Sequence, residues 1–97
     1  MAEPLPRERR ALATAVRVLR ARNAMTQAEV LDAAGLGRNY LTGLERGTSN
    51  PTFDALVHIA RALDVTFTEL ATTYDAQLAD QRAAADGGSE RHRPSAR

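Results

Sequence analysis

Cysteine, lysine and tryptophan are missing from the chain, and the first two absences carry information. Without cysteine there is no disulfide framework, no thiolate metal site and no cysteine nucleophile. A cytoplasmic location is the natural expectation for such a composition. Because lysine is missing, all thirteen basic side chains are arginines. Their planar guanidinium groups can hold a phosphate or a guanine edge through two parallel hydrogen bonds.

The sequence also has little that indicates catalysis or a membrane. No stretch approaches the ~18 uninterrupted apolar residues of a membrane span, and no apolar run follows the arginines of residues 1–10 as a signal peptide requires. No acidic pair is placed for general acid–base work, and His58 and His92 have no second ligand at metal spacing. We expect no enzyme, no metal and no cofactor. Without a pocket-forming domain, we also expect no small-molecule ligand.

Charge is distributed unevenly along the 97 residues, although the net charge is only +1. Residues 1–50 carry eight arginines against five acids, whereas residues 51–85 carry two arginines against five acids. The N-terminal half is therefore basic and the following segment acidic. This asymmetry favours one face for a polyanion and another face for a different contact.

Apolar residues recur at helical spacing, and no segment shows the alternation of a strand. Capping boxes at Thr26–Glu29 and Thr66–Glu69 mark helix starts, and Gly35 and Gly47 mark helix ends. The pattern predicts an all-α domain over residues 7–85, with a flexible arm at 1–6 and a disordered tail at 86–97. The five predicted helices span residues 7–22, 27–34, 38–46, 53–63 and 67–82. The predicted inward-facing residues of the fourth helix are Phe53, Leu56, Ile59, Ala60 and Leu63.

The second and third predicted helices form a helix-turn-helix unit over residues 27–46. They are short, and the tight turn Gly35-Leu36-Gly37 joins them. In such a unit the first helix lies across the DNA backbone and the second enters the major groove.

Several short motifs occur in order across 55 of the 97 residues. They are Met25-Thr26-Gln27, the Gly35 turn, Leu44-Glu45-Arg46-Gly47, Asn50-Pro51 and Ala62-Leu63-Asp64-Val65. Through them the stretch from Val16 to Leu70 resembles the Cro/C1-type family of helix-turn-helix transcriptional regulators, also called XRE-type or lambda-repressor-like. The resemblance implies a five-helix lambda-repressor-like DNA-binding domain.

The family pattern also implies roles for individual residues. Arg38, Asn39 and Thr42 would contact bases, because arginine suits guanine and asparagine suits adenine. Arg20 and Glu45 would form a structural pair between the first and third helices. The implied DNA backbone contacts are Gln27, Gly37, Tyr40, Thr48, Ser49 and Asn50. For Tyr40 a half-buried packing role is an equal alternative, and Thr48 and Ser49 are as compatible with shaping the loop.

Two glycines depart from the family pattern. Gly37 replaces the serine or threonine that usually precedes the third helix, so capping there is weaker. Gly43 lies inside the predicted helix 38–46, where glycine costs up to ~1 kcal/mol relative to alanine. We expect it to allow a close approach of the backbone to DNA or to the preceding helix.

The last predicted helix carries an apolar stripe of Phe67, Leu70, Tyr74 and Leu78. The stripe either covers the core of one protomer or pairs with its symmetry mate. We favour a homodimer, because four short helices cannot cover every apolar group of the fifth. A two-fold dimer presents two recognition helices about one DNA turn (~34 Å) apart and selects a palindromic operator.

The sequence thus predicts a sequence-specific, double-stranded DNA-binding transcriptional regulator. Two alternatives lie within the same family, a restriction–modification controller and an antitoxin-type regulator. The run Arg38–Arg46 and the lack of a sensor domain are similar to those of controller proteins, and the antitoxin-type regulator is equally open. A third alternative is a helix-turn-helix protein-interaction module without a DNA site, for which the near-neutral net charge is the main support.

Overall fold

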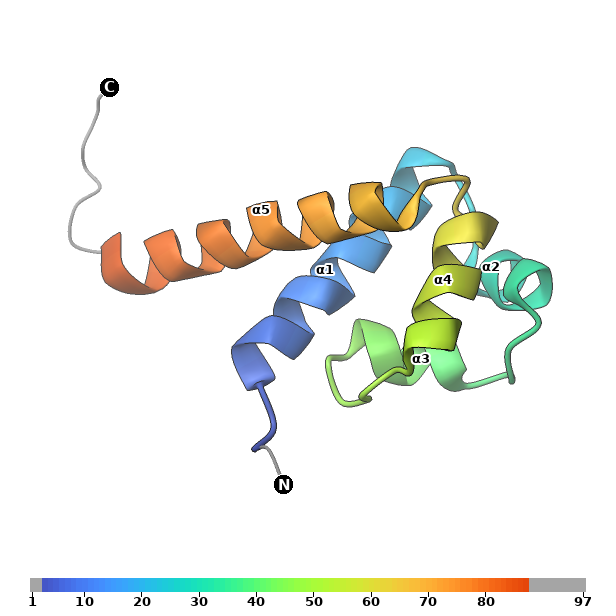
Figure 1. Cartoon of the computed structure of the whole chain (residues 1–97), viewed down its shortest axis with the longest axis horizontal. Helices are drawn as coiled ribbons and strands as arrows, with labels where there is room; N and C mark the ends of the chain where they lie inside the picture. Colours follow the sequence, from blue (N-terminus) through green and yellow to red (C-terminus); the bar gives the residue numbers. More distant parts are fainter. Residues whose placement is uncertain (1–2, 88–97) are drawn as a thin grey trace.

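The protein was analysed as a computed structural model, which describes residues 3–87. These residues form five helices and no strand, so the predicted all-α class is confirmed (Figure 1). The helices are α1 (Pro6–Arg22), α2 (Gln27–Ala34), α3 (Tyr40–Glu45), α4 (Phe53–Ala62) and α5 (Phe67–Gly87).

Three threonines fix where α2, α4 and α5 begin. Thr26 and Glu29 form the predicted capping box: the Glu29 N–H donates to Thr26 Oγ1 at 3.1 Å, and the Thr26 N–H donates to Glu29 Oε1 at 2.8 Å. Thr52 accepts from the Ala55 N–H, and Thr66 accepts from the Glu69 N–H. Each bond satisfies a backbone donor that a helix start would otherwise leave free.

The third helix is shorter than the sequence predicts. It begins at Tyr40 rather than near Arg38, and Asn39 at its N-cap makes no side-chain capping bond. A turn bond from the Tyr40 N–H to the Gly37 carbonyl (3.1 Å) leads into it. Because Gly37 offers no hydroxyl cap, nothing extends the helix backwards. Arg38 and Asn39 therefore lie in the turn before α3, not within its first helical turn.

The fifth helix is longer than predicted and ends at Gly87 rather than near residue 82. Its last turns are rich in alanine, the strongest helix former. Gln81 also anchors it to α1: with its amide nitrogen toward the Arg7 carbonyl (3.1 Å), the amide oxygen accepts from the Ala11 N–H at 3.2 Å. The predicted disordered tail 86–97 is thus wrong for residues 86 and 87. Residues 88–97 lie outside the described residues.

At the other end, Glu3–Leu5 form no regular element, and Pro6 opens α1 at a position where proline is tolerated. The predicted arm 1–6 therefore ends one residue early, and residues 1 and 2 lie outside the described part. Within residues 3–87, no helix combines the length and the apolar character needed to cross a bilayer.

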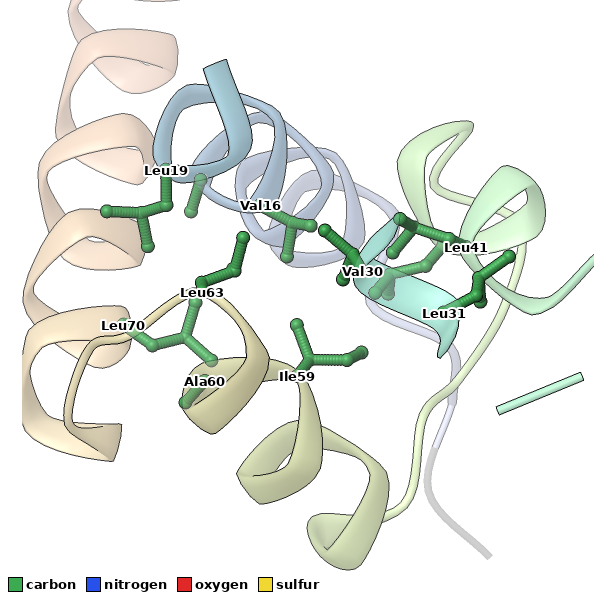
Figure 2. Packing of buried hydrophobic residues seen from close by; sticks show 11 residues of the cluster. Val16, Leu19, Val30, Leu31, Leu41, Ile59, Ala60, Leu63 and Leu70 are labelled. Carbon is green, nitrogen blue, oxygen red and sulfur yellow. The ribbon is translucent and has the colours of Figure 1, made fainter. Parts of the chain in front are cut away.

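All five helices contribute to one hydrophobic core (Figure 2). In Figure 2, Leu70 of α5 lies beside Leu63 and Ala60 at the end of α4. The fully buried large side chains are Val16, Leu19, Val30, Leu41, Leu44, Ile59, Leu63 and Leu70.

Two predicted positions, one for an aromatic and one for an aliphatic side chain, are wrong. Phe53, predicted to be inward-facing, is 65% exposed and stacks edge-to-face on Phe67 with ring centroids 5.4 Å apart. Leu70, predicted at the dimer interface, is only 2% exposed and belongs to the protomer core. Both differ for one reason: the packing of α4 against α5 decides which residue of each stripe faces inward.

We expect Ile59→Ala to lower the free energy of unfolding by about 2–5 kcal/mol, because it leaves a cavity in this core. His58→Ala, at an exposed position on the same helix, is the matched comparison. It should change the free energy of unfolding by no more than about 0.5 kcal/mol, as surface substitutions usually do. Urea denaturation of both variants measures the difference, and equal losses would contradict the described packing of α4.

Candidate functional site

The predicted pair Arg20 and Glu45 is present as a bidentate ion pair. Arg20 Nε donates to Glu45 Oε2 at 2.8 Å, and Nη2 donates to Oε1 at 3.0 Å. Glu45 is 5% exposed and Arg20 is 22% exposed. Arg20 Nη1 also donates to the Met25 carbonyl at 3.0 Å. One guanidinium therefore joins α1, α3 and the segment that leads into α2.

The same ion pair affects the protonation of Arg20. Its hydrogen bond to Glu45 raises the pKa of Arg20 above the ordinary value, although burial acts in the opposite direction. The guanidinium, which is charged at neutral pH in any case, is thus held more firmly in its charged form by the pair.

Gln27 and Thr42, predicted to contact DNA, are held against the ion pair. Gln27 Nε2 donates to Glu45 Oε1 at 3.0 Å, and Thr42 Oγ1 donates to Gln27 Oε1 at 3.3 Å. An amide nitrogen has two hydrogens, so Gln27 keeps one donor for a further acceptor. These contacts fix the N-terminal end of α2 beside the middle of α3.

The residues of the predicted base-reading turn, Gly37, Arg38 and Asn39, are exposed. Neither Arg38 nor Asn39 makes a side-chain hydrogen bond or ion pair within residues 3–87. Thr42 lies one helical turn beyond Asn39. The structure thus brings the predicted base contacts together at one end of α3, next to the start of α2.

The loop after α3 is held by its own hydrogen bonds. The Thr48 N–H and hydroxyl both donate to the Gly43 carbonyl, at 3.0 and 3.1 Å. Ser49 Oγ is buried without a partner in the described residues, so it is not accessible to a phosphate in this conformation. Asn50 is exposed. Thr48 and Ser49 therefore shape the loop, which is the alternative considered for them, whereas Asn50 is free to contact a ligand.

Gly43 faces this loop and not the preceding helix, so of the two approaches expected for it only the one to DNA stays a prediction. A Cβ atom there would lie 3.7 Å from Ser49 Cβ and from Thr48 Oγ1, which is ordinary van der Waals contact. Tyr40 is half-buried and packs against the core, so its geometry fits the packing alternative.

An apolar groove of about 860 Å³ begins beside the loop after α3, with Asn50 among its lining residues. Leu5 of the arm, Leu12 of α1, Pro51 of the loop and residues of α5 line it. Three residues of the predicted dimer stripe, Phe67, Leu70 and Tyr74, are among them, although Leu70 is almost fully buried, and Leu78 is half-buried elsewhere on α5. This volume lies within the range of ligand pockets, but no ligand class follows from its lining, and the expectation of no small-molecule ligand stays a prediction.

No sequence pattern indicated this groove, because its residues come from the arm, α1, the loop after α3, α4 and α5. Leu5, which lines it, and Phe53, which contacts its lining residue Phe67, are the most exposed large apolar side chains described; Phe53 was predicted as a core residue, and Leu5 was given no role. Among the residues that the structure describes, no group of three or more His, Cys, Asp or Glu side chains could hold a metal ion.

Comparisons with known proteins agree with this geometry. The helix-turn-helix family (HTH_3) matches residues 16–70. The uncharacterized HTH-type transcriptional regulator y4dJ of Sinorhizobium fredii is 44% identical over 57 residues, which cover 59% of this chain and 74% of that protein.

Two solved structures are similar over most of the helices. The clp gene regulator ClgR from Corynebacterium glutamicum matches with a TM-score of 0.78 and 30% identity, over 88% of each chain. The restriction–modification controller protein C.AhdI from Aeromonas hydrophila matches with a TM-score of 0.62 and 31% identity, over 64% of this chain and 94% of its own. Both relatives are regulators by name.

We expect Arg20→Ala to destabilise the protein by about 3 kcal/mol, because it leaves the buried Glu45 carboxylate without its cation. Arg22→Ala is the matched control, since its contact with Glu69 is long (3.7 Å) and both side chains are about half exposed. It should cost less than about 1 kcal/mol. Chemical denaturation followed by circular dichroism tests this, and a loss in Arg20→Ala as small as in the control would refute it.

Proposed function

The chain belongs to the Cro/C1-type helix-turn-helix family of transcriptional regulators, and on this premise we propose that it binds a palindromic double-stranded DNA operator as a homodimer. The observation that carries the proposal is the exposed pair Arg38 and Asn39 before α3. They lie one turn from Thr42, which Gln27 ties to the start of α2. Such a protein acts in the cytoplasm, where its DNA is.

In the proposed complex the N-terminal end of α3 enters the major groove. Arg38 contacts a guanine and Asn39 contacts an adenine, each through two hydrogen bonds. Thr42 has its hydroxyl hydrogen directed at Gln27, so it meets DNA through its methyl group or as an acceptor. Base specificity rests mainly on Arg38 and Asn39, because Gly43, one position after Thr42, has no side chain that could contact a base.

The phosphate contacts flank this region on both sides. Gln27 supplies its remaining amide hydrogen at the N-terminal end of α2, where free backbone N–H groups and the helix dipole favour an anion. Gly37 approaches the phosphates with its backbone, and Asn50 does so from the loop after α3. In this complex Tyr40 packs against the core and does not contact DNA. Thr48 and Ser49 hold the conformation of the loop that carries Asn50.

The proposed dimer interface centres on Phe53 and Phe67. Their contact forms the most exposed apolar feature described, and exposed apolar patches of this kind mark association sites. Leu5 and Tyr74 continue it along the groove, and Leu78 lies further along α5. Leu70 has no place in the interface, because it is buried within one protomer.

One narrower role has support from a specific observation. The match to the controller protein C.AhdI at 31% identity favours a role in a restriction–modification system. The match to ClgR has the higher TM-score and covers more of the chain, so regulation of other genes is the broader proposal. The genes adjacent to this one distinguish the two roles.

We expect Arg38→Ala to lose sequence preference at one base position per half-site, with ~1–3 kcal/mol less discrimination there. Selection from a random-sequence duplex library identifies the operator. Titrations against DNA from the upstream region of the gene, at two salt concentrations, then test autoregulation. Arg61→Ala, an exposed arginine on α4, is the control and should keep the preference.

If wild-type protein binds all duplexes weakly and Arg38→Ala binds them equally well, the DNA-binding proposal fails. The protein-interaction alternative then gains support. That alternative predicts that the Arg38→Ala variant still binds its protein partner.

We expect Phe67→Glu to weaken the dimer and the binding of a palindromic duplex, while binding of a single half-site is retained. A charge there opposes burial of the patch. Val18→Glu is the control, because Val18 is exposed but does not line the groove. Sedimentation equilibrium gives the mass of each variant. An unchanged dimer in Phe67→Glu would place the interface elsewhere.

A further inference from the structure

Residues 47–52, in the loop between α3 and α4, contain no charged side chain, and the only arginine directly next to them in the sequence is Arg46, the C-cap of α3. The proposed phosphate contact of this loop, Asn50, is neutral. The salt-dependent part of DNA affinity comes from cationic side chains that neutralise phosphates and release counterions. Apart from Arg46, which directly precedes it, a cation beside this loop must come from a neighbouring element.

Arg10 on α1 is the arginine that lies against this loop. Gly47 ends α3 with a φ of +75°, and a Cβ atom there would lie 3.6 Å from the N, Cα and Cγ atoms of Arg10. The second turn of α1 and the first residue of the loop are thus in direct contact, as their positions in Figure 1 also indicate. Arg9, Asn50 and Pro51 line the groove together, which places the same turn of α1 beside the rest of the loop.

The guanidinium of Arg10 is available for a ligand. Arg10 is exposed, and within residues 3–87 it has no acidic partner, whereas the arginines that contact Glu8, Glu45 and Glu69 do. The Thr14 hydroxyl donates to the Arg10 carbonyl at 3.0 Å, so it engages only the backbone. An arginine without such a partner offers up to five N–H donors to an anion.

We propose that Arg10 contacts the DNA phosphate backbone beside the loop after α3. The contact extends the DNA-binding surface onto the first turns of α1, outside the residues 16–70 that match the family. This inference rests on the proposed function. It adds a source of DNA affinity that does not depend on the base sequence of the DNA. Arg10 lies at the end of α3 opposite Arg38, so it holds the phosphates while Arg38 and Asn39 read the bases.

The test compares three variants of the full chain. Arg10→Gln removes the charge and keeps much of the aliphatic stem that packs on Gly47. Arg10→Lys keeps a charge. Arg82→Gln is the matched control, because Arg82 is 58% exposed, has only a long contact (4.0 Å) with Glu8, and lies on α5, which carries no proposed DNA contact. Thermal unfolding checks each fold, and Arg10→Met replaces Arg10→Gln if that variant does not fold.

Two probes are titrated over a range of salt concentrations, the operator selected from a random-sequence library and an unrelated duplex. We expect Arg10→Gln to reduce the slope of log K against log salt by about 0.9 for each bound protomer. It should weaken binding of both duplexes by the same factor. Arg10→Lys should keep the wild-type slope, and so should Arg82→Gln.

The outcomes separate this inference from the function on which it rests. If wild-type protein selects an operator and Arg10→Gln keeps its slope, Arg10 makes no phosphate contact, although the proposed function stands. A loss confined to the operator would make Arg10 a base contact and also overturn the inference. If wild-type protein shows no salt-dependent binding to either duplex, the proposed function fails and the inference fails with it.

Discussion

The buried carboxylate of Glu45 is the constraint on which the arrangement of the proposed site depends. It accepts two hydrogen bonds from Arg20 and one from Gln27. A carboxylate that is 5% exposed is costly unless all its partners are in place. Since those partners come from α1 and α2 while Glu45 ends α3, a displacement of any of the three helices removes at least one hydrogen bond from a buried charge.

This constraint compensates for the low intrinsic stability of α3, the proposed recognition helix. α3 has only six residues, contains Gly43 and has no side-chain N-cap. A helix of this length is not stable alone in water. Its position comes from the buried side chains of Leu41 and Leu44, and from Thr48, which holds the Gly43 carbonyl. The orientation of the turn before α3 therefore depends on the core, and core mutations can alter DNA binding without touching DNA.

The two segments that flank residues 16–70 contact each other. The first turns of α1 and the second half of α5 pack together, with Ala11 and Ala15 buried between close helices and Gln81 bonded to the α1 backbone. Their packing holds the N-terminal end of α1 beside the loop that follows α3. The match to ClgR, which covers 88% of this chain, extends beyond the helix-turn-helix region in the same way.

The sequence by itself determined the number and class of the helices, because capping threonines, stop glycines and apolar periodicity act within a few residues of one another. The resemblance to a family supplied the pairing of Arg20 with Glu45, which are 25 residues apart and which no local pattern connects. Only the tertiary structure decided that Phe53 is exposed and Leu70 is buried, and that Arg10 lies against Gly47. Those outcomes depend on the positions at which helices distant in sequence cross, and a single-helix pattern does not contain that information.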